Sequence, residues 1–182
     1  MDFAPVIENI DFYWQGLFTT VQLVLAALIL GLAIAIPLAI MRASQHRYLR
    51  FPAWLYIYII RGTPLLVQLY IIYYGLGQLE SMKESFLWAF FKEAYWCALF
   101  AFTLNTSAYT AEILRGAIDT MPKGELEAAK AFGMSKSNIY RRILLPSAFR
   151  RSLPAYSNEV IFLLHGSAVA GVITLVDITG AA

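Results

Sequence analysis

Residues 12–41 read FYWQGLFTTVQLVLAALILGLAIAIPLAIM, a stretch without a single charged side chain. A helix needs only about 20 residues to cross the roughly 30 Å hydrocarbon core of a bilayer, so this stretch is long enough for a membrane span. The aromatic residues at its start are typical of the interface between lipid and water. We therefore predict a first span over about 16–41, in which Pro37 is tolerated because neighbouring helices can satisfy the freed carbonyl.

The composition of the whole chain agrees with a membrane protein. Of its 182 residues, 59% are hydrophobic and 14% are charged, and the mean hydropathy is +0.61. A soluble domain carries roughly 25% charged residues, so lipid must be the solvent for much of this surface. The first 13 residues carry three acidic and no basic side chains, which argues against a secretory signal. The single cysteine, Cys97, excludes an internal disulfide framework and a cysteine-based zinc site.

Charged residues divide the remaining chain into further apolar blocks. The block 51–79 is interrupted by the turn Arg61-Gly62-Thr63-Pro64, and as one helix it would be about 43 Å long, too long without strong tilt. Pro64 removes a backbone donor and keeps the preceding residue out of the helical region, so we predict an interfacial piece over 52–60 and a break at this turn. The predicted spans cover residues 16–41, 65–79, 94–116 and 154–176.

These spans predict an all-α integral membrane fold, a single transmembrane domain over 1–182 in which a bundle of four helices is visible. The segment 117–151 holds seven Lys or Arg, and the connection after the first span holds three arginines. Basic connections of membrane proteins face the cytoplasm. We therefore predict that both connections are cytoplasmic and that the N-terminus lies outside.

The segment 117–151 has the pattern of two helices outside the bilayer. The first is expected to start after the turn Pro122-Lys123-Gly124, with two glutamates in its first turn, where the helix dipole favours negative charge. Gly133 is a candidate left-handed C-cap. Ser135 or Ser137 is expected to cap a second short helix, which Pro146 closes. On these grounds alone the segment could be an ordinary cytoplasmic loop.

A specific pattern lies within this segment. Glu127-Ala128-Ala129, Gly133 and Ile143-Leu144-Leu145-Pro146 resemble the E-A-A-x3-G-x9-I-x-L-P motif of binding-protein-dependent ABC importer permeases, with the same spacing. In that family the motif forms a coupling helix that docks into a cleft on the cytoplasmic ATPase. The resemblance implies that this chain contacts its ATPase at four positions: Glu127, Ala128, Ala129 and Gly133.

Three further stretches, 61–68, 103–112 and 153–161, resemble the polar amino-acid permeases, and the last looks most like the M-type subunit of histidine, lysine–arginine–ornithine and opine importers. The resemblance implies a second homologous permease, two ATPase subunits, an extracytoplasmic amino-acid-binding protein and a place in the bacterial inner membrane. The family usually has five spans and this chain shows four, so we expect it to be truncated at its C-terminus.

Ionisable groups within spans are costly and mark functional candidates. Glu159, in the fourth span, would suit the cationic side chain or α-ammonium group of a basic amino acid. A structural pairing, with Arg61 or with a backbone break, is the alternative. Arg61 itself could be an arginine that snorkels to the membrane interface.

Asn105, Tyr109 and Glu112 are spaced at i, i+4 and i+7, so they share one face of the third span. An asparagine facing lipid would be expensive, so this face should point into the bundle. Glu112 is followed by Arg115 three residues on, and such a pair is usually structural. The candidates for the substrate pathway are therefore Asn105, Tyr109 and Glu159.

The sequence contains no phosphate-binding loop, metal-ligand cluster or nucleophile triad. We therefore expect no catalytic residue, no metal and no cofactor, and we expect the energy to come from a separate ATPase. Two other functions stay open. An ion-coupled secondary amino-acid transporter would carry inverted repeats, which are not visible here. A non-transporting membrane scaffold would bind partners without moving a solute.

Overall fold

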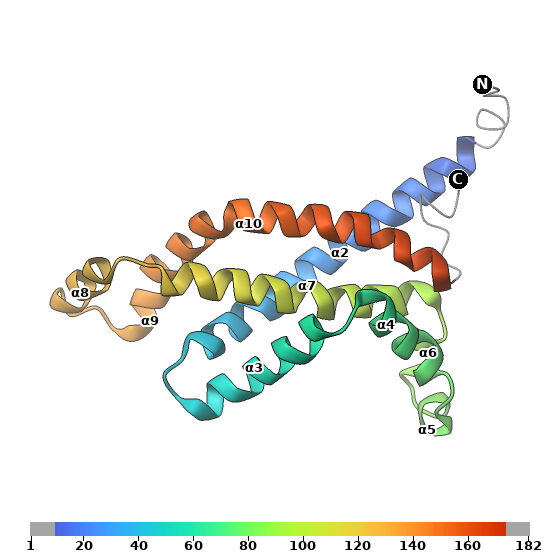
Figure 1. Ribbon diagram of the computed structural model, residues 1–182, viewed down its shortest axis with the longest axis horizontal. Coiled ribbons are helices and arrows are strands. Elements are labelled where there is room, and N and C mark those ends of the chain that lie inside the picture. Colours follow the sequence, from blue (N-terminus) through green and yellow to red (C-terminus); the bar gives the residue numbers. More distant parts are fainter. Residues whose placement is uncertain (1–9, 174–182) are drawn as a thin grey trace.

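The computed structural model describes residues 10–173, which form helices and no strand. Figure 1 shows them as a bundle with one bent arm. The elements are α2 (Ile10–Ala43), α3 (Arg47–Gly62), α4 (Leu65–Tyr70), the π-helix η1 (Ile71–Gly75), α5 (Glu80–Lys83), α6 (Trp88–Phe91), α7 (Ala94–Asp119), α8 (Lys123–Ala131), α9 (Lys136–Ile139), the π-helix η2 (Tyr140–Leu144), α10 (Leu145–Gly166) and the 3-10 helix η3 (Ser167–Ile173).

Helix α7 lies at the centre of the bundle. It packs against α2 over much of its length and also contacts α10 and α3 (Figure 1). Many of its buried residues are small or polar, which lets the neighbouring helices approach closely. They include Ala98, Ala101, Thr103, Asn105, Thr106, Ser107, Ala108, Thr110 and Ala111.

Helix α2 approaches α7 closely at Gly31. A Cβ atom placed on Gly31 would lie 2.3 Å from Cγ2 of Thr106 and 3.4 Å from the backbone nitrogen of Ser107. Real Cβ atoms are not found at the shorter of these distances, so the absence of a side chain at Gly31 is what permits this contact.

The predicted break within the turn 61–64 is found at its second half, and the helix before it is longer than the predicted piece 52–60. Helix α3 ends at Gly62, Thr63 and Pro64 have extended backbone angles, and α4 leaves at 100° to α3. The second predicted span, 65–79, is however longer than the helix found there. Helices α4 and η1 end at Gly75, and 11 residues rise only about 16 Å, about half of a hydrocarbon core. The two arms of the bend fit either one broken span or a re-entrant loop.

The prediction that Pro146 closes a short helix is wrong. The chain is helical from Lys136 through η2 and α10 to Ile173, and Pro146 stands in the first turn of α10. A proline in a helix removes one hydrogen bond and its ring collides with the carbonyl four residues earlier. The wider turns of η2, directly before it, change the hydrogen-bond register and accommodate the ring. Pro154, expected at the start of the fourth span, likewise lies inside α10.

Length and composition allow two of the described helices to cross a membrane, Ile10–Ala43 and Lys136–Ile173, and a third crossing if α3 and α4–η1 form one bent span. Helix α7 covers the predicted span 94–116 but is less apolar than these helices, because its buried polar residues lower its hydropathy. Its crossing of the membrane stays a prediction. The predicted end of the fourth span, at 176, lies outside the described residues.

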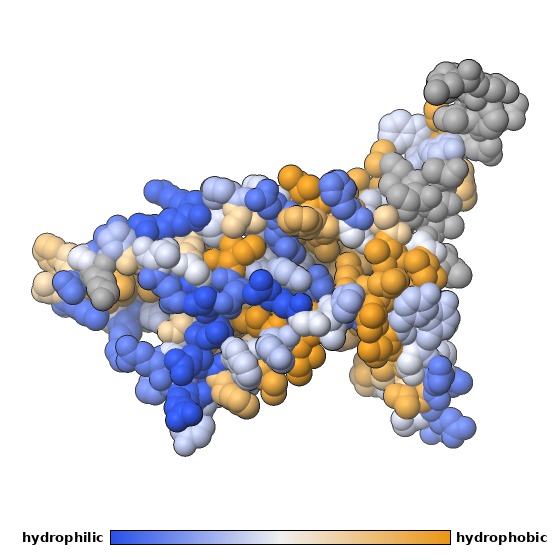
Figure 2. Space-filling model, viewed as in Figure 1, coloured by the Kyte–Doolittle hydropathy of each residue, from blue (hydrophilic) through white to orange (hydrophobic). Residues whose placement is uncertain are grey.

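The surface agrees with a membrane protein. Hydrophilic residues gather toward the end that carries α8, α9 and the start of α3 and again at the tip of the arm with α5, and most of the hydrophobic surface lies between them (Figure 2). The exposed large hydrophobic side chains of α2 include Phe18, Leu25 and Ile29. Such a band of exposed apolar residues is what lipid requires.

Candidate functional site

A cavity of about 770 Å³ lies between the α3–α4 turn, α7 and α10. The turn contributes residues 61–64 together with Leu65 and Leu66 of α4. The three residues predicted to line the substrate pathway, Asn105, Tyr109 and Glu159, all line this cavity. The other lining residues are Ile113, Ala155, Asn158, Phe162, Leu163, Gly166 and Val169.

The cavity wall carries one negative and one positive side chain. Glu159 of α10 is buried, with 8% of its surface exposed, and Arg61 lies at the end of α3. The structure shows no ion pair between them, so the predicted alternative of a Glu159–Arg61 pairing is not formed. Burying a carboxylate is costly unless another group compensates for the charge. The carboxylate of Glu159 and the guanidinium of Arg61 thus both line the cavity without contacting each other.

Arg61 is held by an aromatic ring. Its Cζ atom lies 4.9 Å from the ring centroid of Tyr109, a cation–π geometry. The guanidinium group therefore belongs to the wall of the cavity, which the interpretation as a snorkelling arginine did not foresee. The contact of Tyr109 with Arg61 is made by its ring.

The side chain of Gln68 holds the broken backbone beside the cavity. Gln68 is not among the residues predicted from the sequence. Its Nε2 donates to the carbonyl oxygens of Ile60 (2.7 Å) and Thr63 (3.0 Å) and to Oγ1 of Thr63 (2.9 Å). Its Oε1 accepts from Nδ2 of Asn105, at 3.2 Å. One buried amide thus joins the end of α3, the extended turn and the central helix. Its position could have pointed to this role, because Gln68 is a lone glutamine in an apolar block four residues after Pro64.

A second cavity, of about 380 Å³, lies beside the first, toward the α2–α3 connection. It shares Arg61, Gly62 and Tyr109 with the first cavity. Its other lining residues are Arg42, Trp54, Ile57, Tyr58 and Glu112. The two cavities are neighbours along the face of α7 that carries Asn105, Tyr109 and Glu112.

Glu112 pairs with Arg115, as predicted, and this pair belongs to a longer chain of ion pairs. Arg115 donates from Nε to Oε1 of Glu112 over 2.7 Å and also pairs with Asp119 one turn further on. Nε of Arg42, on α2, lies 3.9 Å from Oε2 of Glu112. Glu112 is thus engaged in ion pairs, whereas Glu159 forms none with the described residues.

The segment that resembles the coupling motif forms α8 and the turn after it. Helix α8 begins at Lys123, two residues before the predicted start, because Pro122 already takes the N-cap position. Gly133 has φ of +72°, which confirms the predicted left-handed C-cap. Ser135 caps α9, with its Oγ accepting from the backbone nitrogen of Asn138 at 3.4 Å. Both turn residues therefore do what the sequence indicates.

The four positions implied as ATPase contacts do not all face outward. Glu127, Ala128 and Gly133 are exposed, whereas Ala129 is buried, with 4% of its surface exposed. Phe132, which the sequence analysis did not single out, is 89% exposed beside Gly133. Its ring lies almost wholly in solvent, directly before Gly133 in the sequence.

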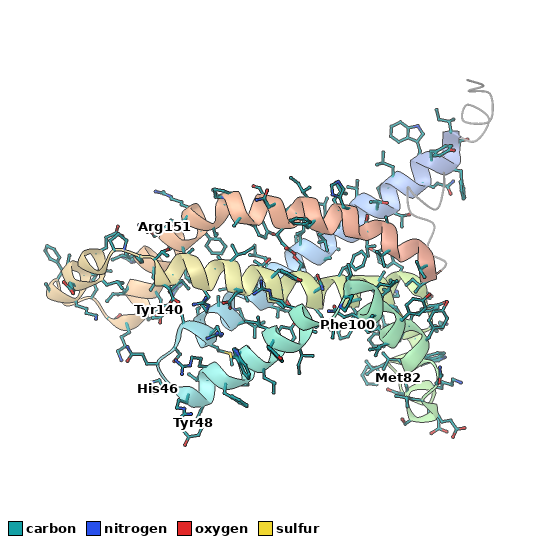
Figure 3. The ribbon with its side chains drawn as sticks, viewed as in Figure 1. His46, Tyr48, Met82, Phe100, Tyr140 and Arg151 are labelled. Carbon is teal, nitrogen blue, oxygen red and sulfur yellow. The ribbon has the colours of Figure 1, made fainter. Side chains whose placement is uncertain are left out.

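Arg151 of α10 joins α8 to the bundle. Its guanidinium donates to the carbonyl oxygen of Thr120 over 3.1 Å and lies 3.8 Å from Oε1 of Glu125 in the first turn of α8. Figure 3 shows Arg151 on the part of α10 nearest to α8. These contacts link the first turn of α8 to α10, the helix that carries Glu159.

Residues 27–181 match the family described as binding-protein-dependent transport system inner membrane component. The chain is 48% identical over 178 residues to the octopine transport system permease protein OccM of Rhizobium radiobacter, covering 94% of this chain and 73% of that protein. It is 47% identical over 175 residues to the histidine/lysine/arginine/ornithine transport system permease protein HisM of Escherichia coli K12, covering 96% of this chain and 74% of that protein.

Solved structures show the same fold. A crystal structure of an amino acid ABC transporter with histidines superposes with a TM-score of 0.83 at 35% identity, covering 98% of this chain and 79% of the other. The inward-facing MetNI methionine ABC transporter superposes with a TM-score of 0.74, covering 93% of this chain and 76% of the other. At 19% identity this second likeness concerns the fold alone.

Proposed function

We propose a transport mechanism from the premise that this chain belongs to the family of binding-protein-dependent transport system inner membrane components. It is a multi-pass permease subunit of an ABC importer, and the ATPase of such an importer is a separate subunit. The proposed substrates are basic amino acids or opines, as in the names of the similar permeases.

The observation that carries this proposal is the pair of opposite charges in the 770 Å³ cavity. An amino acid with a cationic side chain offers both a carboxylate and one or two positive groups. Glu159 would take the side-chain cation or the α-ammonium group, and Arg61 would take the α-carboxylate, for which a planar guanidinium is well shaped. Asn105 and Asn158 would supply neutral hydrogen bonds.

Access to the cavity would alternate between the two sides of the membrane. The exposed residues Glu127, Ala128, Phe132 and Gly133 would form the contact with the ATPase, and Ala129 would support them from inside. Closure of the ATPase subunits would move α8, and Arg151 would pass this movement to α10. A second homologous permease would complete the translocation path, and a binding protein would deliver the substrate to the outer side, where the N-terminus is expected.

Reconstituted uptake tests this function. The chain, a second permease, the ATPase and the binding protein are placed in proteoliposomes, and uptake of radiolabelled arginine and octopine is measured with and without ATP. Glu159→Gln removes the charge but keeps the shape, and we expect uptake to fall at least about tenfold, the equivalent of 1.4 kcal/mol. Glu84→Gln, at an exposed position far from the cavity, is the matched control.

Two outcomes would contradict the proposal. Uptake driven by an ion gradient without ATP and binding protein would indicate a secondary transporter. Full uptake by the Glu159→Gln variant would show that the cavity does not recognise the substrate through this carboxylate. In that second case the family assignment would stand and only the substrate site would need to be sought elsewhere.

A further inference from the structure

A third cavity lies at the connection between α2 and α3, away from the cavity that holds Glu159. Its volume is about 320 Å³, and three of its five lining residues are arginines. Arg42 comes from the last turn of α2, and Arg47 and Arg50 come from the first turn of α3. The other two lining residues are Phe51 and Trp54. The cavity is therefore a basic pocket with an aromatic side.

The positive charge of this pocket has little compensation within the described residues. Arg47 and Arg50 form no ion pair there, and the first turn of α3 contains no acidic residue. The N-cap residue, His46, makes no side-chain capping hydrogen bond. The N-terminus of a helix already carries a partial positive charge, so arginines at this position repel it. An anion bound between the arginines would relieve both effects.

Arg42 gives a second, independent indication that an anion binds in this pocket. Its Nε atom is buried and has no hydrogen-bond partner among the described residues, since Oε2 of Glu112 at 3.9 Å is too far for a hydrogen bond. Leaving a charged donor buried and unsatisfied is unfavourable. The side chain reaches both the second and the third cavity, so a small shift toward an anion in the third cavity would satisfy it.

The aromatic residues around the pocket point to a lipid rather than a soluble anion. Tyr48 is 95% exposed, Phe51 is 60% exposed and Trp54 is 39% exposed. Trp54 stacks on Tyr58 with ring centroids 5.3 Å apart, which extends the aromatic surface along α3. Figure 3 shows Tyr48 pointing away from the bundle at this connection. Exposed aromatic rings beside arginines are typical of the level of the lipid headgroups.

We propose that this pocket binds the phosphate group of an anionic phospholipid. The guanidinium groups of Arg47 and Arg50 would hold the phosphate oxygens, which arginine can do with two parallel hydrogen bonds. The acyl chains would run along Phe51 and Trp54 toward the apolar surface of α3. Basic pockets between membrane helices are known to bind anionic headgroups in this way. The leaflet is the one at the end of the molecule that carries α8 (Figure 1).

Lipid titration tests the site. The 182-residue chain, purified in a nonionic detergent, is titrated with phosphatidylglycerol and, in parallel, with phosphatidylcholine of the same acyl chains, and bound lipid is counted by native mass spectrometry. We expect phosphatidylglycerol to bind at least tenfold more tightly. The double variant Arg47→Gln/Arg50→Gln should lose at least tenfold in affinity for phosphatidylglycerol. Arg141→Gln/Arg142→Gln removes the same charge from η2 and should bind like the unsubstituted chain.

Three results would overturn the proposal. The first is equal binding of the two lipids by the unsubstituted chain, a measurement that needs no variant to fold. The second is unchanged binding of phosphatidylglycerol by Arg47→Gln/Arg50→Gln. The third is displacement of phosphatidylglycerol by an equimolar amount of inorganic phosphate, which would mark the pocket as a site for free anions. The proposal does not depend on the substrate assigned to the Glu159 cavity.

Discussion

The side-chain amide of Asn105, on α7, donates a hydrogen bond of 3.2 Å to the side-chain oxygen of Gln68, on α4. The amide nitrogen of Gln68 faces three oxygens of residues 60 and 63, and this arrangement fixes which way the group points. Both residues are almost fully buried. The hydrogen bond therefore sets the position of the broken α3–α4 turn, and with it Arg61, relative to the centre of the bundle.

Gln68→Leu should destabilise the protein. It removes the partners of the Ile60 and Thr63 carbonyls and of the Asn105 amide, and each buried polar group left unsatisfied costs about 1–3 kcal/mol. We expect a loss of about 2–4 kcal/mol in the free energy of unfolding, read from thermal or denaturant unfolding in detergent. Gln78→Leu, at an exposed glutamine beyond the same helix, should change it little. Equal stability of the two variants would show that the network does not hold the turn.

Tyr109→Leu should weaken substrate recognition through Arg61. The Tyr109 ring lies under the guanidinium, and a cation–π contact contributes about 0.5–2 kcal/mol. Loss of this contact corresponds to a rise of about 2- to 30-fold in the substrate concentration that gives half-maximal uptake. Tyr109→Phe keeps the ring and loses only the hydroxyl, so it should stay close to the parent. If Tyr109→Phe loses as much as Tyr109→Leu, the hydroxyl rather than the ring is what matters, and if neither variant loses anything, the contact with Arg61 plays no part in recognition.

Local chemistry explains which parts of this structure can be predicted from the sequence. The break at Arg61-Gly62-Thr63-Pro64 and the helix end at Gly133 depend on proline and glycine within a few residues, and both are found where expected. Asn105, Tyr109 and Glu159 follow from the cost of polar groups inside spans, and the structure brings all three to one cavity.

Tertiary contacts explain the rest. Pro146 fails as a helix stop because the π-helical turn before it relieves the clash, and nothing local in 140–144 announces such a turn. Gln68 was missed because one of its four hydrogen bonds goes to a helix 37 residues away and the others go to backbone or turn atoms. Ala129 is buried although the motif around it is exposed, and only the packing of α8 reveals that.

Phe132→Ala should leave the stability of the chain unchanged and weaken its contact with the ATPase. The ring is 89% exposed, so little apolar burial is lost within the chain itself. Aromatic residues at the centre of interfaces contribute 2 kcal/mol or more, about 30-fold in affinity. Binding of the ATPase subunit and substrate-stimulated ATP hydrolysis would both be measured. Phe86→Ala, at a ring that is 82% exposed outside α8, is the matched control. An equal effect of the two variants would argue against α8 as the docking element.

Gly31→Ala should separate α2 from α7. The added Cβ would meet Cγ2 of Thr106 at 2.3 Å, and because threonine is branched at Cβ its methyl group has little freedom to move away. Overpacking of this kind costs about 1–3 kcal/mol, measurable as a lower unfolding temperature in detergent. Gly116→Ala, on α7, meets nothing within 4 Å and should be neutral or raise stability by about 0.5–1 kcal/mol, because alanine is the better helix former. Thr106→Ser deletes the obstructing methyl group and keeps the hydroxyl, so Gly31→Ala/Thr106→Ser should recover most of the loss. If the second substitution restores nothing, the contact between Gly31 and Thr106 is not what brings the two helices together.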